Sequence, residues 1–205
     1  MTDDQDDPVL AGIVDELAGQ GWSVSERFVE ASIWQDLARE CRLLEKSGAF
    51  RPAGVGMGGG LSVRQEIRSD SIHWLDPEGQ SPAQRQCLAR LEVLRQRVNR
   101  ELFLGLHEFE GHLAVYPPGS FYRRHLDQFH GVERRQLTII LYLNEDWQTD
   151  HGGQLQIELD EAGNILRVEP LGGRLVTFLS ARFYHEVLPA RRERLSLTGW
   201  FKRRL

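Results

Sequence analysis

The residues best able to do chemistry lie in the segment FYRRHLDQFH, residues 121–130, which holds His125 and Asp127 in a His-x-Asp spacing. If this segment is a β-strand, residues two apart point to the same side, so both side chains converge on one point. Imidazole and carboxylate groups are common metal ligands. A short spacing of this kind also arises by chance. Without further ligands, the pair could equally be two polar residues on an exposed strand.

A third candidate ligand, His185, lies further along the chain. It opens a strand that follows the apolar run GGRLVTFLS and the turn ARFY, and a β-barrel can bring that strand beside the first one. Two histidines and one carboxylate on one face of an octahedral metal leave positions open, which suits non-haem Fe(II) chemistry with oxygen. A structural zinc site is more often closed by four protein ligands that include cysteines. Neither Cys41 nor Cys87 is close in sequence to these candidates.

Two further residues could hold an acidic co-substrate. Arg194 follows His185 on the returning strand, and the planar guanidinium group suits a carboxylate bidentately. Tyr116 ends the strand before the His-x-Asp segment and could add a hydroxyl donor. The alternatives are a surface arginine beside Arg191 and Arg192, and an ordinary core tyrosine.

The composition describes one domain of ordinary globular character. The chain has 205 residues and a formal net charge of −5, which argues against a general nucleic-acid binder. The beginning MTDDQDDP is acidic where a secretory signal would be basic, and no apolar run approaches membrane-spanning length. Two cysteines make no disulfide framework. We therefore expect a cytoplasmic chain without a membrane or nucleic-acid partner, although the arginine-rich end ARRERLSLTGWFKRRL leaves a local basic patch open.

The first half of the chain reads mainly as helix. The acidic residues 1–7 are expected to form a disordered tail. Helices are predicted over residues 8–20, 30–46 and 82–103, from apolar residues spaced three or four apart. The run GVGMGGG lacks the lysine ending of a phosphate loop and is expected to be a flexible joint. Residues 61–76 alternate twice, which indicates a hairpin or finger.

From Gly111 the pattern changes to eight short β-rich runs separated by turn residues. Their spacing is typical of a sandwich or barrel. Helices followed by strands indicate an α+β fold with the helices packed on one face of a β-core. We expect a single domain over residues 1–205, with supporting helices and the finger in 8–104 and the β-core in 111–201.

Four segments, YPPGSFYRRHLD, LTIILYLNEDW, HGGQLQI and HEVLPARRERLSLTGWF, resemble the Fe(II)/2-oxoglutarate-dependent oxygenases. More narrowly, they are similar to the oxygen-sensing (HIF-type) prolyl hydroxylases and their bacterial relatives. The resemblance covers roughly residues 61–201, where RQEIRSDSIHWL is similar to the finger loop that covers the substrate. It implies a double-stranded β-helix, or jelly-roll, core.

The resemblance also implies roles for individual residues. His125, Asp127 and His185 would be the iron ligands. Arg194 would bind the distal carboxylate of 2-oxoglutarate, and Tyr142 would point into the same pocket.

Other assignments stay more open. Tyr116 would assist the arginine, but the spacer after it is one residue shorter than in the animal enzymes, so Tyr122 is an alternative. Trp200 would line the pocket near the metal, or serve packing only. Arg68 and Asp70 could contact substrate from the finger, or could simply pair with each other.

The remaining histidines lack a paired ligand spacing. His130 is expected to be solvated or to face the substrate rather than to bind metal. We expect His73, His107, His112 and His151 to be structural or exposed.

The function that the resemblance implies is hydroxylation of a prolyl residue at C4 within a protein loop. It implies Fe(II), 2-oxoglutarate and O₂, with ascorbate as a supporting reductant. In bacterial relatives a translation factor such as elongation factor Tu is the expected kind of target. Hydroxylation of a free amino acid or other small molecule, and a non-catalytic module that senses metal or 2-oxoglutarate, are the alternatives. A long finger at residues 61–76 favours a peptide or protein substrate, because a small substrate needs no such clamp.

Overall fold

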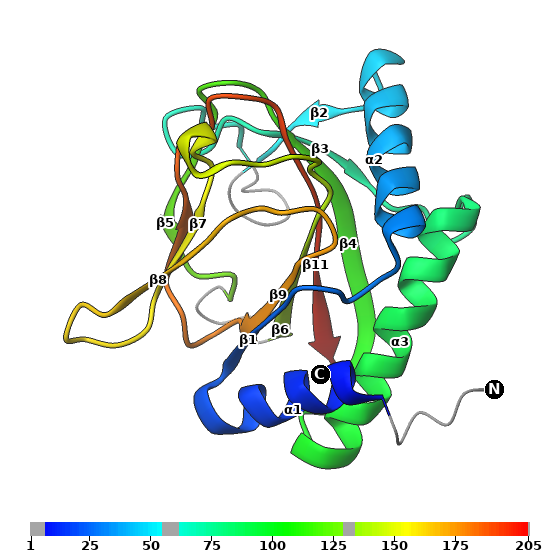
Figure 1. Cartoon of the computed structure of the whole chain (residues 1–205), viewed down its shortest axis with the longest axis vertical. Helices are drawn as coiled ribbons and strands as arrows, with labels where there is room; N and C mark the ends of the chain where they lie inside the picture. Colours follow the sequence, from blue (N-terminus) through cyan, green and yellow to red (C-terminus); the bar gives the residue numbers. More distant parts are fainter. Residues whose placement is uncertain (1–6, 55–61, 129–133, 205) are drawn as a thin grey trace.

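The computed structural model describes residues 7–54, 62–128 and 134–204. Three helices pack on one side of a β-core: α1 (Pro8–Gln20), α2 (Ala31–Lys46) and α3 (Pro82–Leu102) (Figure 1). Their ends follow the local sequence. Pro8 begins α1, Ser81 caps α3 by accepting from the Gln84 amide, and Gly21 ends α1 in the left-handed conformation.

The larger of two antiparallel sheets has seven strands in the order β1-β9-β6-β11-β4-β3-β2. These strands are β1 (Trp22–Ser25), β2 (Arg51–Pro52), β3 (Ser71–Trp74), β4 (Leu106–Tyr116), β6 (Arg135–Tyr142), β9 (Leu175–Leu179) and β11 (Arg194–Arg203). Three of these strands, β1, β2 and β3, come from the part of the chain before residue 105, so that part supplies strands as well as helices. A short 3₁₀ helix, Thr149–His151, follows β6.

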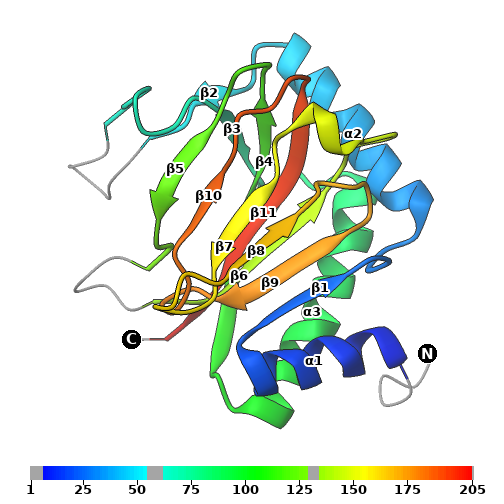
Figure 2. The ribbon, with the colours of Figure 1, turned by 60° about the vertical axis from the view of Figure 1, so that its left-hand side comes forward.

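The smaller sheet has the order β5-β10-β7-β8 and faces the larger one (Figure 2). Its strands are β5 (Tyr122–His125), β7 (Leu155–Glu158), β8 (Ile165–Val168) and β10 (His185–Val187). The expected α+β fold is therefore confirmed, and all eight β-rich runs after residue 105 form strands.

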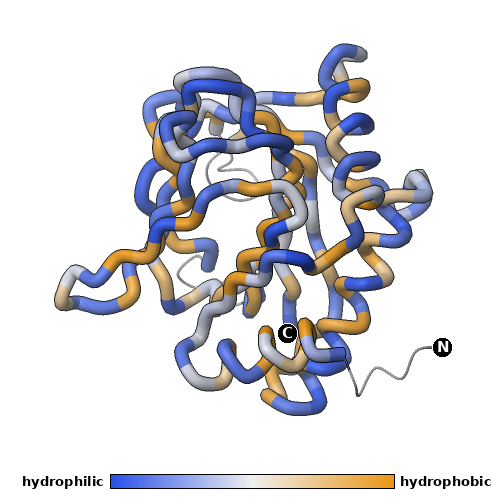
Figure 3. Tube along the Cα trace, in the orientation of Figure 1, coloured by the Kyte–Doolittle hydropathy of each residue, from blue (hydrophilic) through white to orange (hydrophobic). Residues whose placement is uncertain are grey.

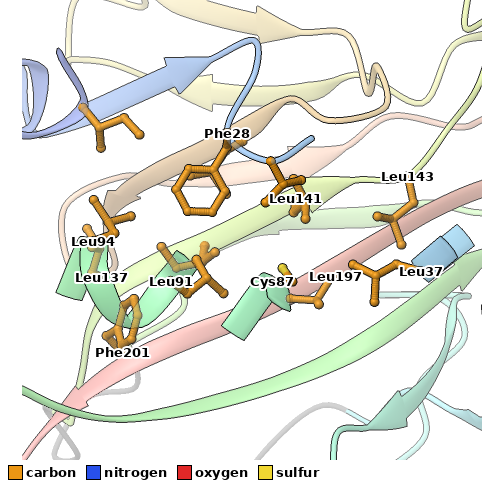
Figure 4. Packing of buried hydrophobic residues seen from close by; sticks show 14 of the residues in the cluster. Phe28, Leu37, Cys87, Leu91, Leu94, Leu137, Leu141, Leu143, Leu197 and Phe201 are labelled. Carbon is orange, nitrogen blue, oxygen red and sulfur yellow. The ribbon is translucent and has the colours of Figure 1, made fainter. Parts of the chain in front are cut away.

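Alternation along the central strands separates two faces of the larger sheet. Leu137, Leu141 and Leu197 point outward and pack against Leu91 and Leu94 of α3, in the core between sheet and helices (Figure 4). The residues that alternate with them, such as Ile140 and Tyr142 of β6, point inward, toward the smaller sheet. The trace coloured by hydropathy shows that apolar and polar residues are interspersed along the helices and strands (Figure 3). In the part of the chain that the structure describes, no helix is both long and apolar enough to cross a membrane.

Three expectations about local structure need correction or restriction. Asp7 was expected in the disordered tail, but its carboxylate caps α1 by accepting from the Val9 and Leu10 amides, and it pairs with Arg90 at 2.5 Å. Strand β4 begins at Leu106 rather than near residue 111, because β11 continues to pair with it as far as Arg203. Residues 1–6, His130 and most of the glycine-rich joint lie outside the described residues.

Candidate metal centre and active-site cavity

His125, Asp127 and His185 come together between the two sheets. His125 ends β5 and His185 begins β10, and the two residues stand directly opposite each other in the antiparallel register. Figure 2 shows the two strands side by side. Asp127 lies in the bend after β5, not on the strand where it was expected. The Asp127 carboxylate oxygens are nevertheless 3.6 Å from Nε2 of His125 and 3.6 Å from Nε2 of His185.

Each histidine is oriented by a hydrogen bond from its other ring nitrogen. Nδ1 of His125 donates to the carbonyl of Arg123 at 2.7 Å, and Nδ1 of His185 donates to the carbonyl of Phe183 at 3.1 Å. These bonds leave the Nε2 lone pairs facing Asp127, which is the arrangement typical of metal-ligating histidines.

The aspartate is held ionised and in place. Burial raises the pKa of Asp127, but His185 and His125 outweigh burial and bring the pKa well below its usual range. Burial, together with His125, lowers the pKa of His185 to about 4, so this imidazole is neutral near pH 7. Thr138 donates a hydrogen bond to Asp127 at 2.8 Å, and Ser180 in turn contacts the Thr138 hydroxyl at 2.9 Å.

This donor set fits Fe(II). One ligand atom from each residue lies within 4.8 Å of the others, and among the described residues these three form the cluster that could hold a metal ion. First-row metals bind such nitrogen and oxygen atoms at about 2.1 Å, so one ion can contact atoms separated by 3.6 Å. Two histidines and a carboxylate on one side leave coordination positions toward the cavity.

A buried arginine stands further along the same inner wall. Arg194 begins β11, is 1% exposed, and pairs in register with Tyr116 of β4. Its Nε donates to the carbonyl of Gly153 at 2.9 Å, and its guanidinium carbon lies 4.9 Å from the ring centre of Tyr116. Asn144 fixes the adjoining backbone by accepting from the Leu195 amide at 2.7 Å.

The surroundings of Arg194 fit a ligand carboxylate. Among the described residues, Arg194 forms no salt bridge with an acidic side chain, which is unusual for a buried cation. Tyr142 lies 5.0 Å from the guanidinium carbon, and its buried hydroxyl has no hydrogen-bond partner among those residues. Tyr142 is not among the residues that line the cavity, whereas Tyr116 is.

The finger residues turn out to pair with each other. Arg68 and Asp70 form two hydrogen bonds, of 2.8 and 2.6 Å, and the Asp70 side chain is fully buried. Arg68 lines the cavity but Asp70 does not. Tyr122 stacks on His125 at 3.6 Å between ring centres and lies beneath Arg68. Tyr122 thus belongs to the metal side of the cavity, and Tyr116 to the Arg194 side.

The cavity between the sheets has a volume of about 500 Å³, within the usual range for small-molecule sites. Trp200 lines it, is 6% exposed, and carries the Arg135 guanidinium on its ring at 3.4 Å. Trp74 of β3 stands at its edge, 48% exposed. His112 lies between the two tryptophans, is 3% exposed and lines the cavity, so of the two expected positions, structural or exposed, the exposed one does not apply.

Sequence reasoning missed three of these contributors. Thr138 and Ser180 support Asp127 from β6 and from the turn after β9, and no local motif marks them. The signal that could have found Thr138 is its alternation: a polar residue on the inner face of the apolar run LTIILY. His112 shares that kind of position on β4.

Comparison with known proteins adds independent findings. The profile of the 2OG-Fe(II) oxygenase superfamily matches residues 111–202. A prolyl-4-hydroxylase from Pseudomonas putida is 50% identical, with a TM-score of 0.87, over 96% of this chain and all of that one. A prolyl hydroxylase from Trichoplax adhaerens, solved with a peptide fragment of the hypoxia-inducible factor oxygen degradation domain, is 28% identical. Its TM-score is 0.83, over 94% of this chain and 88% of that one.

Among curated proteins, human Egl nine homolog 1 is 31% identical over 94% of this chain and 46% of its own length. The chain thus spans less than two thirds of the first curated relatives that it matches. The two facing sheets with supporting helices match the jelly-roll architecture of the Pseudomonas structure, so the expected fold is confirmed.

Proposed function

The chain belongs to the 2OG-Fe(II) oxygenase superfamily, among relatives of the prolyl hydroxylases, and from this premise we propose that it hydroxylates a prolyl residue at C4 in a protein substrate. One observation carries the proposal: His125, Asp127 and His185 converge at one end of a cavity. At the other end stands Arg194, which forms no salt bridge with an acidic side chain among the described residues. When bound, Fe(II) and 2-oxoglutarate supply the oxidation that inserts one oxygen atom of O₂ into a C–H bond.

The protein's own groups would position the metal ion and 2-oxoglutarate and shield them from water. His125, Asp127 and His185 would hold the ion from one side, which leaves the opposite side to ligands. Arg194 would bind the distal carboxylate of 2-oxoglutarate, with Tyr116 beside it, because a buried guanidinium gains a charge-assisted hydrogen bond there. Leu155 and Val187 of the smaller sheet and Ile140 of the larger one line the space between and exclude water.

A protein substrate is supported by the residues at the edge of the cavity. Arg68 belongs to the finger segment, forms a salt bridge with Asp70 and lies over the ring of Tyr122. These contacts place the finger segment at the metal side of the cavity. The Trichoplax relative was solved with a peptide. Trp74 and Trp200 add an aromatic wall, the kind of surface on which proline-containing segments dock. A translation factor such as elongation factor Tu is the first target to test.

The test measures succinate release together with product mass. We expect the chain, supplied with Fe(II), 2-oxoglutarate, ascorbate and O₂, to add one oxygen atom to a proline in elongation factor Tu or in a member of a proteome-derived peptide library. Fragmentation spectra locate the modified residue, and hydrolysis with chromatography distinguishes 4-hydroxyproline from its isomers. Hydroxylation of free proline alone would favour the small-molecule alternative, and ligand binding without any product would favour a sensor module.

Two substitutions divide the site into its parts. Asp127→Ala should abolish iron-dependent turnover, because a buried charged ligand is lost. Arg194→Ala should mainly raise the KM for 2-oxoglutarate, by about a hundredfold for a lost charge-assisted pair. Full activity of Asp127→Ala would rule out this metal centre.

A further inference from the structure

His112 is a buried polar side chain that lines the cavity. It is 3% exposed, and its buried Nδ1 has no hydrogen-bond partner among the described residues. Its neighbours are aromatic: the ring centre of Trp74 is at 5.0 Å and that of Trp200 at 5.5 Å. Because an unmade hydrogen bond of a buried group costs free energy, such a side chain marks a place where a ligand completes the contact.

The sheet register places His112 beside Trp74, at the edge of the cavity. It pairs with Thr198 on β11 and with Trp74 on β3, so it lies between the centre of the sheet and the edge strands. Along β4 it is four residues from Tyr116, or about 13 Å at the rise of an extended strand. The carbon chain of 2-oxoglutarate, anchored at Arg194 in the Tyr116 row, is shorter than that distance. This position suits a contact with the other substrate better than a contact with 2-oxoglutarate.

The imidazole of His112 is neutral. Burial, together with the guanidinium groups of Arg68 and Arg135, lowers the pKa of His112 to about 3. A neutral imidazole has one N–H donor and one acceptor nitrogen. The two nearby cations are themselves paired, with Asp70 and with Glu110, yet they favour an electron-rich oxygen over a positive group at this place.

A prolyl residue offers such an oxygen. Proline has no backbone N–H, so the peptide bond before its ring presents only a carbonyl acceptor. We propose that His112 is a substrate-binding residue that donates a hydrogen bond to a main-chain carbonyl oxygen beside the target proline. The flanking Trp74 and Trp200 rings supply the apolar surface for the pyrrolidine ring. This inference rests on the proposed function and extends it to one recognition contact.

Steady-state kinetics with paired variants test the contact. The probe is the shortest prolyl peptide that the wild-type chain hydroxylates in the library screen. His112→Leu should raise the KM for that peptide about tenfold, the effect of one lost hydrogen bond, and should change the KM for 2-oxoglutarate less than about twofold. Asn and Gln carry an amide donor near the positions of Nδ1 and Nε2, so either His112→Asn or His112→Gln should recover most of the peptide KM.

The matched control is His107→Leu on the same strand. His107 is exposed and its ring faces Arg204 rather than the cavity, so this variant should keep the wild-type peptide KM. A second measurement, by NMR, observes His112 in the wild-type chain and does not depend on whether His112→Leu folds. In wild-type chain loaded with Zn(II) and 2-oxoglutarate under nitrogen, the ¹⁵N signals of His112, assigned by their loss in His112→Gln, should shift when the peptide is added.

The outcomes separate the two proposals. An unchanged peptide KM in folded His112→Leu, or His112 signals that do not respond to a peptide that binds, overturns the contact and leaves the hydroxylase proposal standing. If the wild-type chain hydroxylates no prolyl peptide or protein, the proposed function is overturned, and the His112 contact with it. A tenfold rise in both KM values would assign His112 to the shape of the whole cavity instead, and would also overturn the contact.

Discussion

At the metal centre, each candidate ligand has a second contact that fixes its orientation. The two histidines use backbone carbonyls, whereas Asp127 relies on the hydroxyl of Thr138, supported by Ser180. A backbone carbonyl is present at every residue, whereas a side-chain hydroxyl is lost when the residue is substituted. The aspartate is therefore the ligand whose geometry a single substitution can loosen without removing the ligand itself.

Thr138→Val tests that dependence with little change of shape. The variant loses the 2.8 Å hydrogen bond to Asp127, so the affinity for Fe(II) should fall about 10- to 100-fold. Anaerobic titration with Fe(II) measures it. Thr177→Val is the control, because Thr177 is equally buried in the neighbouring strand but its hydroxyl has no hydrogen-bond partner among the described residues. Equal affinities in both variants would mean that Thr138 does not orient the ligand.

His112 also predicts a pH dependence of folding stability. Its pKa in the folded chain, about 3, lies below the ordinary value of 6.5, so between these values the unfolded chain binds more protons. Stability should therefore fall as the pH falls below 6.5. Metal-free wild type should lose about 2 kcal/mol more than His112→Gln between pH 7 and pH 5, measured by urea unfolding. Parallel curves for the two proteins would show that folding does not lower the pKa of His112.

At the scale of elements, antiparallel register does what sequence spacing cannot. His125 and His185 are adjacent because β5 and β10 pair, and Arg194 meets Tyr116 because β11 pairs with β4. Gly153, in the loop before β7, then fixes the arginine. Its φ is +69°, and an added Cβ would lie 3.2 Å from Cδ of Arg194 and 3.1 Å from Trp147. A side chain there would press directly on the guanidinium stem.

Gly153→Ala should weaken 2-oxoglutarate binding about tenfold, because the alanine displaces Arg194 in addition to straining the backbone. The measurement is the dissociation constant for 2-oxoglutarate by calorimetry. Gly163→Ala separates strain from crowding, since Gly163 has a φ of +87° with nothing within 4 Å of the added carbon. If both variants bind 2-oxoglutarate equally, the close approach to Arg194 has no functional effect.

The sequence predicted the helices and strands more fully than it predicted which of them lie side by side in the fold. Apolar periodicity and the caps at Pro8, Ser81 and Gly21 placed the helices within a residue or two. The start of β4 was missed because Glu108 and Glu110 break the apolar pattern, and their partner Lys202 lies at the far end of the chain. The His-x-Asp pair and His185 stood out by type. Thr138 and His112 did not, because only pairing across strands brings them to the site.

On the scale of the whole molecule, packing and chemistry occupy opposite faces of one sheet. The outer face of the larger sheet lies against the helices (Figures 1 and 4). Its inner face lines the cavity together with the smaller sheet. Every central strand contributes to both, because alternate residues point opposite ways. The helices thus hold the sheet rigid without supplying any of the candidate ligands.

That division predicts that stability and ligand affinity can be separated. Leu94 of α3 is fully buried against the sheet, so Leu94→Ala should lower the free energy of unfolding by about 2–5 kcal/mol, as denaturant titration would measure. In the folded variant the Fe(II) and 2-oxoglutarate affinities should stay within about twofold of wild type, since Leu94 lies on the far side of the sheet from the cavity. Leu43→Ala on α2, a side chain that is 68% exposed, should change neither quantity. A large loss of metal affinity in folded Leu94→Ala would instead mean that the helical layer sets the geometry of the site through the sheet.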